Sequence, residues 1–349
     1  MSGQRAATGL LARLDEGPVV CAEGYLFEFE RRGYLQAGAF VPEIVLEHPE
    51  LVRGLHEEFV HAGSDVVLAF TYYGHREKLR MIGKEGLLEP LNRDAIAIAV
   101  DVARRTGALA AGDLCNTNAY SPDRESRRAV KAMFEEQVGW IAEGGVDYVV
   151  GETFSWGEES LLALETIRAA GLPSVMMLAI HSDGQTREGW TPEEACRRLA
   201  DAGADVVGLN CARGPATMLP LIERIRATVD GHLAALPVPY RTTPEQPSFQ
   251  SLRDPGCDCL PGDRPFPTAL DPFTCNRYEI AQFARSAYAL GVNYLGVCCG
   301  AGAHHIRSMV EALGRTAPAS RFSPDMSKHA YLGTDKLVRD HNREYAQNL

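Results

Sequence analysis

The sequence lacks a long apolar run, an apolar stretch behind its first residues, and an excess of positive charge. No run approaches the roughly 20 apolar residues that a helix needs to cross a bilayer, and the opening Met1-Ser2-Gly3-Gln4-Arg5 leads into no apolar core of a secretion signal. We therefore predict a cytoplasmic protein without a membrane partner. The 35 Lys and Arg against 46 Asp and Glu give a formal net charge of −11, which argues against nucleic acid as a partner.

The composition also lacks a break that would divide the chain. The 349 residues, 45% of them hydrophobic, are enough for one large α/β barrel or two ordinary domains, and nothing in the composition favours two domains.

Cysteine, by contrast, is plentiful. Nine cysteines without a secretion signal indicate reduced thiols at metal or reactive sites more than disulfides.

Two of these cysteines are adjacent, at the end of a predicted strand. Cys298 and Cys299 follow the apolar residues 292–297 and precede Gly300. Neighbouring side chains of a strand point to opposite faces, so both thiols reach one ion only where the strand has ended and the backbone turns. Gly300 permits that turn. The alternative to a metal site is that both cysteines are small buried side chains that fill space in the core.

A third thiol, Cys211, ends another apolar stretch at residues 204–210. Three thiolates leave one position of a tetrahedral zinc ion open, as catalytic sites do. We therefore predict a zinc site made by Cys211, Cys298 and Cys299. Four further cysteines have no such context, and we predict that they pack in the core or lie at the surface: Cys21, Cys115, Cys196 and Cys275. Cys257 and Cys259 could pair with each other or bind a second metal, but a single C-x-C without a partner motif more simply has no such role.

One short phrase recurs along the chain, each time between an amphipathic segment and an apolar one. Its glycine suits a helix end, and its Asp or Asn leads into a buried strand. Other strands are predicted between the copies, at residues 18–21, 108–114, 174–180 and 232–238, which makes eight. The copies are AGSDVV (62–67), GGVDYV (144–149), AGADVV (202–207) and LGVNYL (290–295).

Strands that alternate with helices eight times predict a (β/α)8 TIM barrel over residues 1–315, with its active site in the loops after the strands. Residues 240–275 form a long Pro-, Asp- and Gly-rich loop after strand seven, which we expect to be a lid over that face.

Residues 316–349 are predicted to be an arm that packs on another subunit. That arm would make the protein a homo-oligomer, either dimer or tetramer, through Tyr331, Leu332, Leu337 and Tyr345.

The predicted metal site suggests a chemistry. Three thiolates donate so much charge that their zinc ion is a poor Lewis acid for carbonyl groups. Such an ion instead suits a fourth thiol, which has a pKa of about 8.5 when free and is held as a thiolate when coordinated. The reaction expected of such a site is transfer of an alkyl group to sulfur.

Five short motifs of this chain are shared with a known family. They are FEFERRGY (27–34), EHPE (47–50), FTYY (70–73), GLNC (208–211) and GVCCG (296–300). With them the chain resembles the zinc-dependent homocysteine S-methyltransferases, and among them the betaine–homocysteine branch, from about Leu11 to Leu349. This resemblance implies a zinc-containing barrel that moves a methyl group from a small onium donor to homocysteine, giving methionine.

The resemblance also implies roles for single residues. Cys211, Cys298 and Cys299 match the zinc ligands. Glu152 matches the carboxylate that receives the amino group of homocysteine, and Tyr73 matches an aromatic residue near the donor's quaternary ammonium, where a ring face attracts a cation. Tyr72 and Tyr73 should alternate in direction, with Tyr73 in the pocket. The remaining predicted substrate-binding residues are Glu23, Gly24, Tyr25, Phe40, Tyr72, Thr153, Phe154 and Asn210.

The chain departs from the family pattern at three places near these residues. The family's Asp-Gly-Gly at the end of strand one reads Ala22-Glu23-Gly24 here, Phe40 stands where the betaine branch has tryptophan, and Thr153 stands where it has tyrosine. The donor therefore stays open between glycine betaine, an unusual betaine, a dimethylsulfonium compound and S-methylmethionine. The acceptor stays open between homocysteine and another thiol. A barrel that binds zinc or thiols without catalysis is the alternative from a different class.

Overall fold

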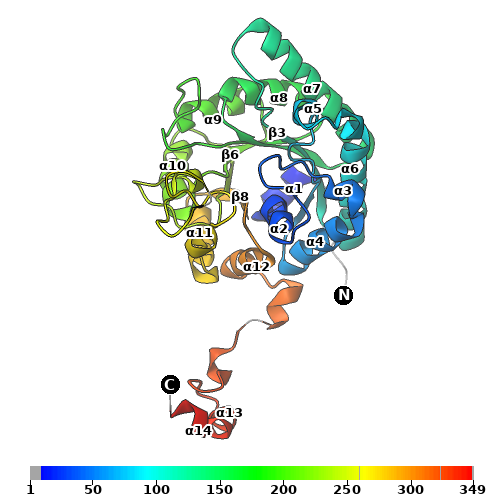
Figure 1. The fold of residues 1–349 in the computed structure, drawn as a ribbon. Coiled ribbons are helices and arrows are strands. Elements are labelled where there is room, and N and C mark those ends of the chain that lie inside the picture. Colours follow the sequence, from blue (N-terminus) through cyan, green and yellow to red (C-terminus); the bar gives the residue numbers. More distant parts are fainter. Residues whose placement is uncertain (1–8, 259, 323, 348–349) are drawn as a thin grey trace.

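Eight parallel strands form a barrel surrounded by helices in the computed structural model, which describes residues 9–347 apart from 259 and 323 (Figure 1). Hydrogen bonds join the strands in the order β1-β8-β7-β6-β5-β4-β3-β2. This is the (β/α)8 barrel that the sequence predicts. The strands are β1 (Val19–Ala22), β2 (Val66–Leu68), β3 (Leu109–Cys115), β4 (Tyr148–Phe154), β5 (Ser174–Leu178), β6 (Val206–Asn210), β7 (His232–Leu236) and β8 (Val292–Val297).

The helices lie outside the strands and follow the predicted alternation. Their bounds are α1 (Leu10–Glu16), α2 (Tyr25–Arg31), α3 (Ile44–Glu47), α4 (Pro49–Ala62), α5 (Arg76–Met81), η1 (Glu85–Leu87), α6 (Leu88–Thr106), α7 (Arg124–Gly144), α8 (Gly157–Ala169), α9 (Pro192–Asp201), α10 (Pro215–Arg226), η2 (Phe249–Ser251), η3 (Asp271–Phe273), α11 (Arg277–Ala289), α12 (Ala303–Ala312), η4 (Pro318–Phe322), η5 (Met326–Lys328), α13 (Lys336–His341) and α14 (Arg343–Ala346). No helix in this described part combines the length and apolar character needed to span a bilayer.

The recurring phrase opens the even-numbered strands, and its Asp joins neighbouring strands at the amino end of the barrel. Asp65 Oδ2 accepts a hydrogen bond of 2.8 Å from the Val20 amide, and the Asp65 amide donates to the Val20 carbonyl at 2.8 Å. Asp147 makes the same pair of bonds with Ala110, and Asp205 accepts from the Ser174 amide. The repeat thus satisfies backbone groups at the start of β1, β3 and β5 that would otherwise lack partners.

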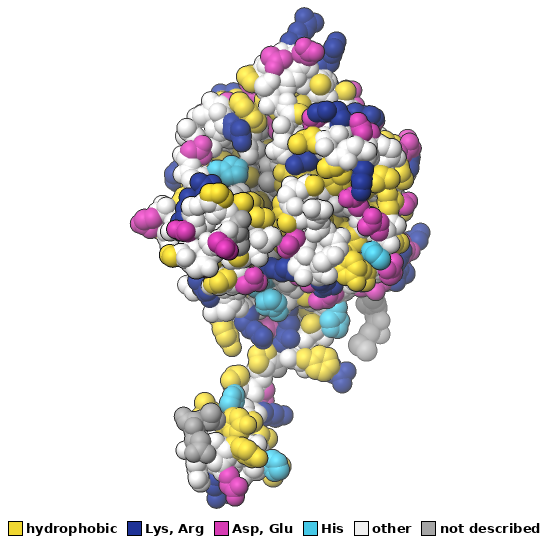
Figure 2. Space-filling model, in the orientation of Figure 1, with side chains coloured by type: hydrophobic (Ala, Val, Ile, Leu, Met, Phe, Trp, Pro, Cys, Tyr) yellow, Lys and Arg dark blue, Asp and Glu magenta, His cyan; other side chains and the backbone are white. Residues whose placement is uncertain are grey.

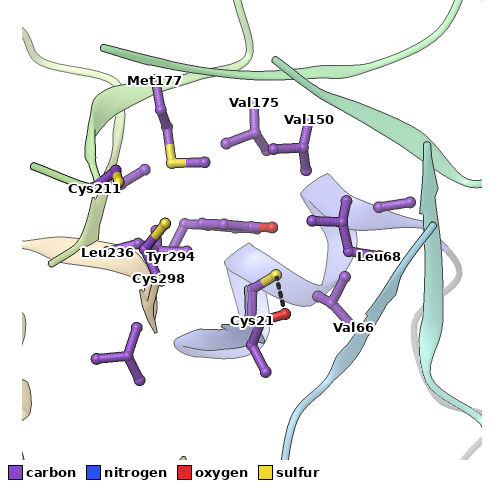
Figure 3. Packing of buried hydrophobic residues seen from close by; sticks show 14 of the residues in the cluster. Cys21, Val66, Leu68, Val150, Val175, Met177, Cys211, Leu236, Tyr294 and Cys298 are labelled. Atoms are coloured by element: carbon purple, nitrogen blue, oxygen red, sulfur yellow. Dashed lines mark hydrogen bonds between the residues drawn. The ribbon is translucent and has the colours of Figure 1, made fainter. Parts of the chain in front are cut away.

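The barrel interior is filled by apolar side chains from all sides (Figure 3). Tyr148 and Tyr294 meet there through their hydroxyls at 2.9 Å. Cys21 is fully buried among them and packs, as expected. Cys211 and Cys298 lie at the edge of this group (Figure 3).

The loop after β7 and the end of the chain lie outside the regular barrel. In the described residues of the loop, the helical segments are two short 3-10 turns, η2 and η3. At the end of the chain, η4 still contacts α4 and α12, so the arm that leaves the barrel begins after residue 322, later than the predicted 316. Beyond η4 the arm projects away from the barrel (Figure 1) and carries exposed apolar side chains (Figure 2). Leu332 is 76% exposed and Leu337 83%.

Replacing Asp65 with alanine should destabilise the barrel where β1 meets β2. The variant would leave the Val20 amide without an acceptor and Arg315 without the ion pair that it makes with Asp65 at 2.5 Å. We expect a loss of about 1.5–3 kcal/mol in the free energy of unfolding, measured by urea denaturation. Asp94→Ala is the matched control, because Asp94 is an exposed helix residue and should change stability little. Equal stability of both variants would contradict this role of the repeat.

Truncation after Pro324 tests the prediction that the arm holds subunits together. Leu332, Leu337 and Tyr345 would be costly to leave in water together, and the truncation keeps η4 on the barrel. We expect the mass measured by light scattering to shift towards the monomer. The full-length variant carrying Leu332→Ser and Leu337→Ser should shift in the same direction. A full-length protein that is already monomeric, or an unchanged oligomer after truncation, would contradict the prediction.

Candidate active site

Three thiols meet at the carboxyl end of the barrel. Cys211 directly follows β6, and Cys298 and Cys299 directly follow β8. Their sulfur atoms all lie within 4.8 Å of one another and are buried, with 3.9 Å between Sγ of Cys298 and Sγ of Cys299. Thiolates bound tetrahedrally to zinc at about 2.3 Å stand about 3.8 Å apart. The donor set and its spacing therefore fit a zinc ion with one position left for another ligand.

The backbone turns sharply to bring these thiols together. Gly300 has a φ of +92°, and a Cβ at this position would lie 2.1 Å from the Tyr240 hydroxyl. Arg31 donates to the Gly300 carbonyl at 3.1 Å and to the Tyr240 hydroxyl at 2.9 Å. Cys211 itself has a φ of +54°. The glycine expected after the cysteine pair is thus required by both conformation and space.

Buried carboxyl groups lie beside the thiols, and Asn210 connects the two. Its side-chain amide donates to Glu152 Oε2 at 2.8 Å, to Glu23 Oε2 at 3.3 Å and to Cys298 Sγ at 3.8 Å. Its Oδ1 accepts from the Thr153 amide at 2.8 Å. The predicted residues Glu23, Glu152, Thr153 and Asn210 are therefore one hydrogen-bonded group next to the thiols.

A small cavity of about 10 Å³ lies beside these carboxyl groups, and Glu23, Asp113 and Glu152 line it. Three buried atoms on its lining residues have no hydrogen-bond partner among the described residues: Glu23 Oε1, Asp113 Oδ1 and the Tyr25 hydroxyl. Burial raises the pKa of Glu23 and of Asp113 well above their ordinary values and raises the pKa of Glu152 to about 7. The volume suits one group of the size of water or ammonium, and an ammonium would supply the missing donors.

A larger cavity of about 200 Å³ opens beside the thiols. Leu26, Tyr72 and Cys299 line both cavities, so the two cavities meet at the Cys299 thiol. Aromatic side chains form much of the larger wall, and two of them, Phe249 and Phe266, come from the long loop after β7. That loop does lie over the active face. The lining residues are Leu26, Phe27, Phe40, Tyr72, Tyr73, Asn116, Asn118, Thr153, Ser155, His181, Arg187, Cys211, Phe249, Gln250, Phe266 and Cys299.

Strained backbone is concentrated around this cavity. Seven described residues other than glycine have a positive φ, and five of them line it: Phe40, Tyr73, Asn118, Thr153 and Cys211. Such conformations cost about 1–3 kcal/mol each and persist at sites where function requires them.

Several predicted site residues lie elsewhere than expected. Tyr72 and Tyr73 do not alternate: β2 has ended, Tyr73 has a φ of +59°, and both rings face the cavity with 4.3 Å between their centroids. Lys78 Nζ stands 4.1 Å from the Tyr73 ring centroid, so one face of that ring already meets a cation. The prediction of Phe154 as a wall is wrong, because Phe154 is fully buried outside the cavity against Phe134.

Gly24, predicted to bind substrate, lines neither cavity. Its lack of a side chain instead lets the backbone pass close to Ala301, because a Cβ on Gly24 would lie 2.2 Å from the Ala301 carbonyl oxygen. His305 lies in the first turn of α12, where its ring bonds to the Gly302 amide and the Cys275 carbonyl, so it caps the helix. Cys257 contacts the Arg264 carbonyl in the long loop, whereas Cys259 lies outside the described residues.

Sequence reasoning missed Asp113, Phe27, Phe249, Phe266, His181 and Arg187 as lining residues. Only Asp113 carried a usable signal, since it is a charged residue in an otherwise apolar strand, and a fully buried charge needs a partner. Phe27 lies on α2 and Phe249 on η2, and the other three come from loops; in each case the position over the cavity depends on the course of the whole barrel.

Comparisons with known proteins agree with this geometry. The family profile "Homocysteine S-methyltransferase" matches residues 24–313. Mouse S-methylmethionine--homocysteine S-methyltransferase BHMT2 is 36% identical over 99% of this chain and 93% of its own length. Betaine--homocysteine S-methyltransferase 1 of Xenopus tropicalis is 37% identical over 96% and 82%. The metallated form of the Escherichia coli homocysteine methyltransferase MmuM shares the fold, with a TM-score of 0.66, 18% identity, and coverage of 85% of this chain and 97% of that one.

The raised pKa of Glu152 predicts a pH-dependent stability. A carboxyl whose pKa rises from 4.5 to about 7 on folding stabilises the protein below 4.5 and loses that contribution as the pH rises through 7. Relative to Glu152→Gln, the metal-free wild type should therefore lose on the order of 3 kcal/mol between pH 4.5 and 8. Urea denaturation with a chelator present measures this difference. Glu245→Gln, at an exposed position, is the control, and a difference that stays constant or grows with pH would contradict the prediction.

Proposed function

The chain belongs to the homocysteine S-methyltransferase family and is a methyltransferase, and we propose that it takes the methyl group from a small onium compound and passes it to homocysteine held at zinc by Cys211, Cys298 and Cys299. The carrying observation is that the three thiols meet where two cavities of different chemistry share Cys299 in their walls. One is small and lined by carboxyl groups, and the other is larger and aromatic.

The small cavity suits the amino group of homocysteine. An ammonium has three N–H donors, and Glu23 Oε1, Asp113 Oδ1 and Tyr25 Oη are buried acceptors without a partner among the described residues. Glu152 supports the same role, because it also lines this cavity and shares the Asn210 amide with Glu23. Ala22 is buried as part of β1, so Glu23 is the carboxyl group that the end of strand one offers here. These contacts favour homocysteine over a thiol that lacks an amino group.

The aromatic cavity suits the onium group of the donor. Phe27 packs near Phe40 and Phe249, with ring centroids 5.8 and 6.1 Å apart, and Tyr72 faces the same space. Ring faces attract cations, most strongly where water is excluded. Because Lys78 occupies one face of Tyr73, the donor would contact the Phe and Tyr72 rings more than Tyr73.

The protein's contribution to the reaction would be orientation and exclusion of water. A zinc ion would keep the homocysteine sulfur as a thiolate. The carboxyl-lined cavity would fix the amino end of homocysteine, and the aromatic cavity would aim one methyl of the donor at that sulfur, so that a bimolecular step takes place between aligned groups. A sulfur–carbon bond forms as the carbon–onium bond breaks, and the bonding pair leaves with a neutral amine or thioether. No proton transfer is needed.

The same reasoning supports a reducing compartment and an oligomer. The three thiols must stay reduced to bind zinc, as they do in the cytoplasm. The exposed apolar residues of the arm suit contact with a second copy of the chain.

The variant Cys211→Ala tests this function most simply. Two adjacent thiolates do not hold zinc in a defined tetrahedron, so metal content and methionine formation should fall together, by about 10-fold or more. Thermal unfolding should stay cooperative, since the thiols lie at one end of a large packed barrel. Cys257→Ala, in the long loop, is the control and should keep both. A Cys211→Ala protein with stoichiometric zinc and normal turnover would contradict the assignment, and one that loses zinc but still transfers methyl groups would contradict the mechanism.

A further inference from the structure

The turn that carries Tyr72 and Tyr73 into the wall of the aromatic cavity is tied to the end of β3. The Thr71 hydroxyl donates to the Asp113 carbonyl at 2.9 Å. Two residues further along both segments, the Tyr73 amide donates to Cys115 Sγ at 3.2 Å. The bond to the Cys115 sulfur is therefore the one that holds the Tyr73 backbone itself.

Cys115 is the last residue of β3, and its sulfur can serve as a hydrogen-bond acceptor. The residue is 2% exposed. Burial raises the pKa of its thiol well above the ordinary value, so the group stays neutral. Among the described residues, Cys115 belongs to no cluster that could hold a metal ion. It thus packs in the core, and its sulfur accepts a bond from a backbone amide rather than binding zinc.

Tyr73 needs this acceptor because of its backbone conformation. Its φ of +59° lies in the left-handed region, which residues other than glycine keep only where the surroundings hold them. Since β2 ends at Leu68, the hydrogen bonds of the sheet do not extend to the Tyr73 amide. An amide without an acceptor is costly inside a protein, so the Cys115 sulfur stabilises this conformation.

Tyr73 in turn supports the Tyr72 ring. Lys78 Nζ stands 4.1 Å from the Tyr73 ring centroid, and the Tyr73 and Tyr72 ring centroids are 4.3 Å apart. Tyr72 lines both the aromatic and the carboxyl-lined cavity, as Cys299 does. A change in the Tyr73 backbone would therefore move a ring that lies where the two cavities meet.

We propose that Cys115 is a positioning residue for methyl transfer, because its sulfur fixes the Tyr73 backbone and thereby sets the Tyr72 ring against which the donor's onium group lies. Cys115 does not line the aromatic cavity, so it acts through the turn and not by contact with the donor. Orientation supplies much of the rate of a direct displacement. This inference rests on the proposed function, which places the onium group in the aromatic cavity.

Tetramethylammonium tests the proposal, because it carries an onium group and no other recognition group. NMR titration of the zinc-loaded protein, without donor or acceptor, gives its affinity independently of turnover. Cys115→Ala removes the acceptor of the Tyr73 amide and should weaken tetramethylammonium about 10-fold. Cys115→Ser offers a hydroxyl oxygen in place of the sulfur and should restore the affinity to within about threefold of the wild type.

Homocysteine provides the internal comparison. Its ammonium is expected at Glu23 and Asp113, which belong to other elements than the turn, and its sulfur at the zinc ion. Calorimetry with homocysteine alone should therefore show a change of less than about threefold in both Cys115 variants. The zinc content of both variants should equal that of the wild type.

Cys196→Ala is the matched control. Cys196 is also fully buried, its thiol contacts the Gly208 carbonyl at 3.8 Å, and it lines neither cavity. The same truncation there removes a buried sulfur without touching the turn, so it should lower the stability and leave tetramethylammonium binding unchanged. Thermal unfolding of all variants, which should stay cooperative, measures the loss of stability separately from the loss of affinity.

Several results would overturn the inference. They are no binding of tetramethylammonium to the wild type, equal affinity of the wild type and Cys115→Ala, a loss that Cys115→Ser does not restore, and an equal loss for tetramethylammonium and homocysteine. Failure of the proposed function has a different signature. In that case tetramethylammonium binding follows the Cys115 variants as expected, but no methyl group passes from an onium donor to homocysteine.

Discussion

Three sulfur atoms must converge at one point, and the rest of the site depends on this constraint. Cys211 follows β6 while Cys298 and Cys299 follow β8, and β7 lies between these strands in the sheet. Only a closed, twisted barrel brings the two strand ends towards one another. The left-handed backbone at Cys211, the glycine at position 300 and the Arg31 clamp on its carbonyl then complete the approach. The strain at these positions is held by the packed barrel below them.

Two chemically different spaces also meet at the thiol of Cys299. On one side, three carboxyl groups and a tyrosine hydroxyl surround a cavity about as large as one ammonium group. On the other, phenylalanine and tyrosine rings surround a cavity that suits a small onium ion. Asn210 joins the carboxyl groups to the thiols, because it donates to Glu152, Glu23 and Cys298. In this account the acceptor and the donor occupy different cavities beside the metal, so that the sulfur and the methyl carbon can be aligned for a direct displacement.

The fold could be predicted from the sequence because the recurring phrase marks the same structural unit four times. Its Asp residues bond to the strand before them, so the pattern has a local cause. The thiols were also predictable, since strand ends meet on one face of a barrel. The directions of side chains that follow the ends of strands could not be predicted from the sequence. Tyr72 and Tyr73 face the same cavity because the strand has ended before them, and Phe154 turns away from it because β4 still continues there. Asp113 was missed because a single charge in an apolar strand has many structural explanations, and only the cavity beside Glu23 and Glu152 distinguishes among them.

X-ray absorption at the zinc edge tests the central claim most directly, because it counts the sulfur atoms around the metal. For the purified, zinc-loaded protein, the account predicts three sulfur neighbours at about 2.3 Å and a fourth when homocysteine is added without a methyl donor. A first shell made mainly of nitrogen and oxygen, or a sulfur count that homocysteine leaves unchanged, would contradict it.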